Sequence, residues 1–80
     1  MNEVIASNLK CLRIMFGKTQ RETANLMGVS KQSYSNIENG KRKISAEELW
    51  KIASELEVDM TIFFETKLTE SVIKKLKVSS

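Results

Sequence analysis

The chain has 80 residues, which is enough for one compact domain with a single core but too few for a deep catalytic cleft plus a second domain. Apolar residues make up 41% and charged residues 29%, a composition typical of a folded globular protein. With no histidine and one cysteine, Cys11, the sequence offers no zinc site, no His-based catalytic group and no intramolecular disulfide. We therefore expect neither an enzyme nor a cofactor.

The formal net charge is +3, and the charges are distributed unevenly. Residues 10–43 hold eight Lys and Arg against two Glu, whereas residues 44–80 hold five Lys against seven acidic residues. This predicts a polyanion-binding face in the first half of the chain, although charge alone fits an ordinary solvated surface equally well. No apolar stretch approaches the roughly 20 residues of a membrane span and no signal-peptide pattern is present, so we expect a cytoplasmic protein without membrane contact.

Glycines and polar caps divide the first half of the chain into three short predicted helices. The first has apolar residues at spacings of four, three and four, and ends near a glycine: Ile5, Leu9, Leu12, Phe16 and Gly17. A capping box, Thr19 to Glu22, opens the second helix at about residues 20–27, and Ser30 caps the third at about 31–38. Two short helices joined by a four-residue link are typical of a helix-turn-helix.

Two further helical segments are predicted after the basic loop 41–43. A second capping box, Ser45 to Glu48, opens a helix whose inward face contains Leu49, Ile52, Ala53 and Leu56. Asp59 then caps a short fifth segment, 60–65, which is too apolar to remain in water without a partner. The expected fold is all-α: a compact five-helix domain over residues 1–65. The tail, 66–80, has helical spacing and either extends the last helix or packs on a partner subunit.

Several ordered motifs resemble one known family across residues 5–64. They are Leu12-Arg13, Thr19 to Ala24, Met27 to Ser30 and Ile37 to Arg42. In this order they resemble the lambdoid phage repressors and Cro, also called the xenobiotic response element family. The resemblance implies a dimeric, sequence-specific transcriptional regulator, acting as repressor or activator on a pseudo-palindromic operator in double-stranded DNA. No small-molecule effector is evident.

Four polar side chains of the predicted third helix fall on one face, away from Tyr34 and Ile37. They are Lys31, Gln32, Ser35 and Asn36. Lys suits the guanine edge, and Gln and Asn can each bond the adenine edge twice. Taken alone this is an ordinary exposed helix face; with the family resemblance, it is predicted to contact bases.

The resemblance also assigns phosphate contacts and one structural ion pair. Gln20 resembles the family's phosphate-contacting glutamine at a helix N-terminus. The residues after the recognition helix are expected to contact the DNA backbone: Asn39, Lys41, Arg42 and Lys43. Arg13 and Glu38 occupy positions that the family often joins by a salt bridge between the first and third helices.

Four residues depart from the family pattern. Thr23 replaces a usual core leucine, Lys18 and Ile44 replace a leucine and a proline, and Glu57 replaces the glycine that ends the fourth helix. At Glu57 the chain must place a non-glycine residue in the left-handed conformation, at roughly 1–2 kcal/mol, or follow a different path.

The remaining apolar residues suggest a homodimer. The predicted interface comprises Trp50, Val58, Ile62, Phe63 and Phe64, with Leu68 and Val72 of the tail as additions. For Trp50, core packing is the alternative. The short chain and its Val58 to Glu65 ending look most like controller proteins of restriction-modification systems. The rival prediction is an antitoxin-type interaction module that occludes a toxin with its apolar tail and binds DNA secondarily.

Overall fold

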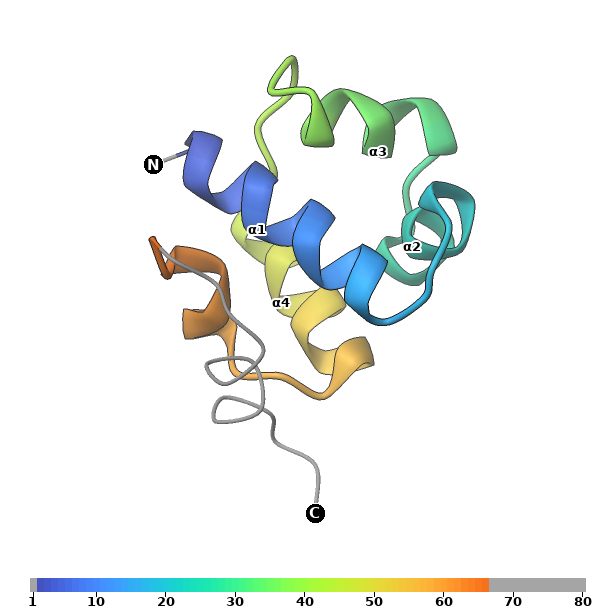
Figure 1. The fold of residues 1–80 in the computed structure, drawn as a ribbon. Helices are drawn as coiled ribbons and strands as arrows, with labels where there is room; N and C mark the ends of the chain where they lie inside the picture. Colours follow the sequence, from blue (N-terminus) through green and yellow to red (C-terminus); the bar gives the residue numbers. More distant parts are fainter. Residues whose placement is uncertain (1, 67–80) are drawn as a thin grey trace.

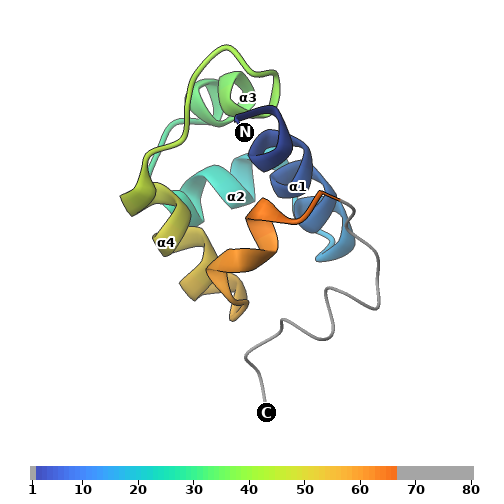
Figure 2. The same cartoon turned by 90° about the vertical axis from the view of Figure 1, so that its left-hand side faces the viewer.

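The computed structural model describes residues 2–66, which form four α-helices and one 3₁₀ helix (Figures 1 and 2). The elements are α1 (Asn2–Met15), α2 (Gln20–Met27), α3 (Lys31–Glu38), α4 (Ala46–Leu56) and η1 (Met60–Phe64). The all-helical prediction is confirmed, since no strand occurs between residues 2 and 66. The number of α-helices is four rather than five. The predicted tail helix lies outside the described residues.

The fifth segment is a 3₁₀ helix because it is too short to establish the α-helical hydrogen-bond pattern. It has five residues, and the Ile62 amide donates to the Asp59 carbonyl three residues earlier, at 3.1 Å. The Asp59 side chain accepts a hydrogen bond from the Thr61 amide at 2.9 Å, as its predicted role as a cap requires. The segment therefore begins where the sequence predicts but coils more tightly.

Side-chain caps fix the helix boundaries. The Thr19 hydroxyl accepts from the Glu22 amide at 3.0 Å while the Glu22 carboxylate accepts from the Thr19 amide at 2.8 Å. The same reciprocal pair joins Ser45 and Glu48 at 3.1 and 3.0 Å. Both predicted capping boxes are confirmed, and they start α2 and α4 at the expected residues.

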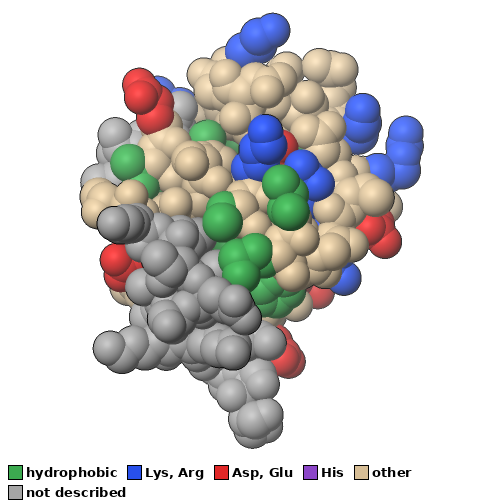
Figure 3. All heavy atoms as spheres, viewed as in Figure 1, with side chains coloured by type: hydrophobic (Ala, Val, Ile, Leu, Met, Phe, Trp, Pro, Cys, Tyr) green, Lys and Arg blue, Asp and Glu red, His purple; other side chains and the backbone are tan. Residues whose placement is uncertain are grey.

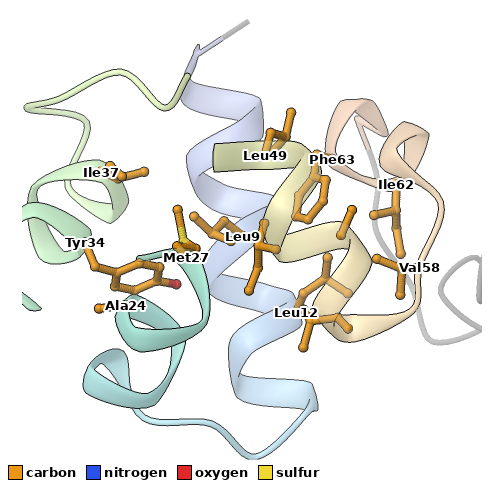
Figure 4. Packing of buried hydrophobic residues seen from close by; sticks show 13 residues of the cluster. Leu9, Leu12, Ala24, Met27, Tyr34, Ile37, Leu49, Val58, Ile62 and Phe63 are labelled. Atoms are coloured by element: carbon orange, nitrogen blue, oxygen red, sulfur yellow. The ribbon is translucent and has the colours of Figure 1, made fainter. Parts of the chain in front are cut away.

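The core lies where α1 packs against α3 and η1, and α2 packs against α3 and α4 (Figure 4). Its buried apolar residues come from every helix: Leu9, Leu12, Ala24, Met27, Tyr34, Ile37, Leu49, Ile52, Ala53, Leu56, Val58, Ile62 and Phe63. The inward face predicted for α4 is confirmed. In α1, Leu9 and Leu12 are buried, while Ile5 and Phe16 pack at the edge of the core.

Three residues predicted at the dimer interface belong to the core, so that assignment was wrong. Val58, Ile62 and Phe63 are 4%, 0% and 0% exposed. The apolar segment folds back against α1 and α4 of its own chain, which removes these side chains from any surface (Figure 4). Trp50, at 61% exposed, and Phe64, at 43%, do lie on the surface.

Asn8, which the sequence analysis did not single out, holds η1 in this position. Its side chain is buried, and Nδ2 donates to the backbone carbonyls of Ile62, Phe63 and Glu65 at 3.4, 2.9 and 2.7 Å. These bonds satisfy carbonyls at the end of a short helix that has no further turn of its own. The available signal was position: Asn8 lies on the apolar face of α1, where a polar side chain requires a partner.

The departures from the family pattern are accommodated locally. Thr23 is buried, and its hydroxyl donates to the Thr19 carbonyl at 3.0 Å, so no polar group is left unpaired there. The Lys18 carbonyl accepts a hydrogen bond from Arg13 Nη1 at 2.9 Å, and Ile44 packs against the edge of the core.

Glu57 ends α4 in the left-handed conformation, with φ 55° and ψ 46°. The next amide, of Val58, donates to the Ala53 carbonyl at 3.0 Å, and the Glu57 amide donates to the Ser54 carbonyl at 3.2 Å. The helix end is therefore closed in the manner usual for glycine, with a side chain in its place. Glu57 is the one non-glycine residue with positive φ between residues 2 and 66.

The Arg13–Glu38 ion pair fixes α3 relative to α1. Arg13 Nε lies 2.6 Å from Glu38 Oε2, and the two side chains are 14% and 3% exposed. Burial alone would raise the pKa of Glu38, but hydrogen bonds from Arg13 and Gln20 outweigh it and hold the pKa below its ordinary value of 4.5. Burial also raises the pKa of the nearby Tyr34 hydroxyl, which has no hydrogen-bond partner of ordinary geometry among the described residues.

Replacing Glu57 by glycine should stabilise the domain. The substitution relieves the left-handed strain but adds backbone entropy to the unfolded chain, so we expect a net gain of about 0.5–1 kcal/mol in the free energy of unfolding. Urea denaturation measures it. Glu55→Gly is the matched control: this exposed position inside α4 should lose about 1 kcal/mol. Equal losses in both variants would contradict the strain at Glu57.

Glu38→Gln should destabilise the protein by about 3–5 kcal/mol at pH 7, because the Arg13 charge stays buried without its counter-charge. Since folding lowers the pKa of Glu38, its contribution is present above pH 4.5 and is lost as the pH falls below that value. The gap in unfolding free energy between wild type and variant should therefore narrow as the pH falls below 4.5.

Denaturant unfolding at several pH values measures this gap. Glu55→Gln is the control, because an exposed position of α4 should change stability by less than about 0.5 kcal/mol. A gap independent of pH would show that the Glu38 carboxylate is not stabilised by its surroundings.

Candidate nucleic-acid interface

The outward face of α3 contains the four side chains predicted to contact bases. The helix buries Tyr34 and Ile37, which are 0% and 1% exposed, against the core (Figure 4). The opposite side carries the predicted set: Lys31 and Gln32 are exposed, and Ser35 and Asn36 are half-buried. One face of α3 thus anchors the helix while the other presents amine, amide and hydroxyl groups to solvent.

The start of α3 follows from the turn that precedes it. Gly28 adopts φ 74°, and its amide bonds carbonyls at the end of α2. The Ser30 hydroxyl then accepts a hydrogen bond from the Ser33 amide at 3.1 Å and caps α3. Glycine is required here for its positive φ, and a Cβ at this position would lie 3.0 Å from Lys51 Nζ.

Two of the polar side chains on this face are bonded to each other. Gln32 Nε2 donates to Asn36 Oδ1 at 3.2 Å, across one turn of α3. The i, i+4 spacing makes such contacts geometrically accessible on a helix, so this interaction could have been anticipated from the sequence. The two amides therefore do not present independent sets of donors and acceptors.

The loop after α3 exposes two lysines, whereas the arginine between them forms an ion pair. Lys41 and Lys43 are exposed, whereas Arg42 is paired with Glu48: Nη2 lies 2.8 Å from Oε2, and Nη1 lies 3.0 Å from Oε1. The Arg42 hydrogen bond, followed by those from Ser45, lowers the pKa of Glu48 to about 2. Arg42 is thus part of an ion pair with Glu48, an interaction that was not predicted from the sequence.

Glu48 has two structural roles, one of which the sequence analysis missed. Its carboxylate completes the capping box of α4 and also binds Arg42 from the loop. The loop is further held at its start, where the Asn36 carbonyl accepts from the amides of Lys41 and Arg42 at 2.8 and 3.2 Å. The basic loop is therefore fixed to α3 at one end and to α4 at the other.

Gln20, in the first turn of α2, bonds to Glu38 of the ion pair that joins α1 and α3. Its side chain is half-buried, and Nε2 donates to Glu38 Oε1 at 3.1 Å. The bond uses one amide hydrogen and leaves the carbonyl oxygen and the second hydrogen available. The position predicted to contact phosphate therefore also serves to orient α3.

Basic side chains are spread over the surface near these helices. In Figure 3, Lys and Arg side chains stand out over the upper and right-hand parts of the view, where Figure 1 places α3 and α2. Between residues 2 and 66, no three His, Cys, Asp or Glu side chains are grouped as a metal site, and no helix has the length and hydropathy of a membrane span.

The fold and sequence match known helix-turn-helix proteins. Residues 9–63 match the HTH_3 helix-turn-helix family. The uncharacterized HTH-type transcriptional regulator YqaF of Bacillus subtilis (strain 168) is 41% identical over 63 residues, which cover 79% of this chain and 83% of YqaF.

Two solved structures are also similar. One is the clp gene regulator ClgR from Corynebacterium glutamicum, with a TM-score of 0.74 and 27% identity over 79% of this chain and 67% of that one. The other is an HTH_3 family transcriptional regulator from Vibrio cholerae, with a TM-score of 0.71 and 43% identity over 79% of this chain. The match spans only 35% of the Vibrio chain. The protein belongs to the HTH_3 helix-turn-helix family, the Cro/C1-like xenobiotic response element family, as its motifs predicted.

Proposed function

We propose that this protein is a transcriptional regulator that binds a pseudo-palindromic DNA operator as a homodimer. In this proposal α3 lies in the major groove and directs its outward face, with Lys31, Gln32, Ser35 and Asn36, to the base edges. The observation that carries it is the division of α3 into a face buried through Tyr34 and Ile37 and a polar face turned to solvent, within a helix-turn-helix fold.

The backbone contacts come from the residues that flank α3. Lys41 and Lys43 are exposed on a loop fixed at both ends, so they approach phosphates with little further loss of conformational entropy. Asn39 and the free part of the Gln20 amide complete the phosphate-contacting set. Arg42 acts mainly by shaping the loop through Glu48, and its remaining N–H groups are free to meet a phosphate.

A second copy of the chain covers the two exposed aromatic residues in this proposal. Trp50 is 61% exposed on α4 and Phe64 is 43% exposed at the end of η1. Large aromatic side chains of this kind are frequent anchors of protein interfaces. The two copies of α3 then enter major-groove segments about 34 Å apart on one side of the duplex.

The sequence suggests two more specific functions for the protein, and the identity of the neighbouring genes would distinguish them. A restriction-modification controller is the narrower form of the same proposal, and a methyltransferase and endonuclease gene beside this one would favour it. The antitoxin-type module is the alternative, and a neighbouring toxin gene would favour it.

Selection from a pool of random duplexes tests the proposed function directly. The full chain is bound to the pool, bound duplexes are amplified over several rounds, and the enriched sequence is compared with a scrambled one by fluorescence anisotropy. We expect an inverted repeat that binds at least about 10³-fold more tightly than the scrambled duplex at physiological salt. Equal affinity for both duplexes would defeat the proposal.

Gln32→Ala and Lys41→Ala should impair binding in different ways. Gln32→Ala should cost about 1–3 kcal/mol on the enriched duplex and relax selectivity at one base pair in each half-site. Lys41→Ala should weaken all duplexes alike and reduce the slope of log K against log salt concentration by roughly one per half-site. Anisotropy titrations at several salt concentrations measure both effects. Identical behaviour of the two variants would contradict this division of roles.

Trp50→Ser should produce a monomer that binds the inverted repeat weakly. Loss of the indole removes the largest apolar side chain offered to a second copy, so sedimentation equilibrium should show a shift towards the monomer mass. Ile14→Ser is the matched control, because Ile14 is an apolar side chain of similar exposure, 58%, on α1. A dimer that is unaffected by Trp50→Ser, or equally weakened by Ile14→Ser, would exclude this interface.

A further inference from the structure

The hydrogen bond between Gln32 and Asn36 determines what Gln32 can offer to a base. We propose that Asn36 is a positioning residue that makes Gln32 select adenine over guanine. The inference deepens the proposed function and rests on it, because it requires α3 to face base edges. Its starting point is the 3.2 Å bond from Gln32 Nε2 to Asn36 Oδ1 on the outward face of α3.

The amide of an unconstrained glutamine has two N–H donors and one carbonyl acceptor. In this protein one of the Gln32 donors is engaged by Asn36, so one N–H and the carbonyl oxygen are left. Adenine presents an acceptor, N7, beside a donor, the N6 amino group, which matches that remaining pair. Guanine presents two neighbouring acceptors, N7 and O6, and a Gln32 with one free N–H can satisfy only one of them.

The bond also fixes the direction in which the Gln32 amide points. A free glutamine can rotate its terminal amide by half a turn and exchange the positions of oxygen and nitrogen. With Nε2 held by Asn36, the oxygen faces away from Asn36, and guanine O6 would meet the Gln32 carbonyl oxygen rather than a donor. The bond is exposed to solvent in the free protein, and it gains strength where DNA excludes water from the groove.

Asn36 can be altered without disturbing the helix that carries it. Its backbone carbonyl accepts from the Lys41 and Arg42 amides, and these bonds do not involve the side chain. The position of α3 is set by buried Tyr34 and Ile37. A change of the Asn36 side chain therefore tests the positioning of Gln32 separately from the fold.

The test uses Asn36→Ala and Asn36→Asp in the full chain. Gln32→Ala first identifies the base pair read by Gln32 in the enriched duplex. Anisotropy titrations then give the ratio of dissociation constants for duplexes with guanine and adenine at that position. We expect wild type to favour adenine by about tenfold or more, and Asn36→Ala to reduce the ratio to about threefold or less.

Asn36→Asp keeps the acceptor oxygen at the same place. Its negative charge should weaken binding to every duplex, but the guanine-to-adenine ratio should stay near the wild-type value, because Gln32 Nε2 still has its partner. Thermal unfolding of both variants, measured beside wild type, reports on the fold. A purely structural role of Asn36 would lower affinity for both duplexes equally and leave the ratio of Asn36→Ala unchanged.

The outcomes separate the inference from the function on which it rests. If no duplex is enriched by wild type, the proposed function fails. If a duplex is enriched but Asn36→Ala keeps the wild-type ratio, or Asn36→Asp loses the ratio as Asn36→Ala does, the positioning role is overturned and the proposed function stands.

Discussion

The carboxylate of Glu38 is bonded by side chains from two other helices, Arg13 of α1 and Gln20 of α2. It lies at the end of α3, and its side chain is 3% exposed. A buried ion pair adds little net stability, because the cost of removing the charges from water offsets most of their attraction. Its larger effect is on orientation: an arrangement of α3 that moved Glu38 away from Arg13 would leave a buried charge unpaired. The outward face of α3 is thereby fixed relative to α1 and α2.

A second carboxylate, that of Glu48, fixes the loop that follows α3. Glu48 receives Arg42 from the loop and the Ser45 amide from the start of α4. Without these bonds a stretch containing Gly40 and two lysines would sample many conformations, and ordering it on DNA would reduce the affinity. Of the three neighbouring cations, Arg42 pairs with Glu48. This pair fixes the loop in a conformation in which the side chains of Lys41 and Lys43 are exposed. Glu38 and Glu48 thus fix the elements on which base and phosphate contacts are proposed.

Much of the fold could be predicted because the signals are local. The capping boxes at Thr19 and Ser45 and the cap at Ser30 depend only on neighbouring residues, and they predicted where α2, α4 and α3 begin. The position of η1 could not be predicted in this way. The apolar side chains of Val58, Ile62 and Phe63 indicate burial. The sequence does not say whether the residues that pack against them belong to the same chain or to a second copy. The deciding contact, from Asn8, joins residues more than fifty positions apart.

The same distinction between local signals and contacts that no local pattern predicts applies to the candidate site. Helical geometry placed Lys31, Gln32, Ser35 and Asn36 together, whereas the Arg42–Glu48 pair spans a loop for which no spacing rule exists.

α3 has eight residues and is therefore about 12 Å long, which matches only three to four base pairs at roughly 3.4 Å each. A site that short recurs too often in a genome to define a promoter. In the proposed function, two copies of α3 on one dimer multiply the discrimination of each half-site, so that proposal depends on a stable dimer as much as on a correct set of contacts on α3.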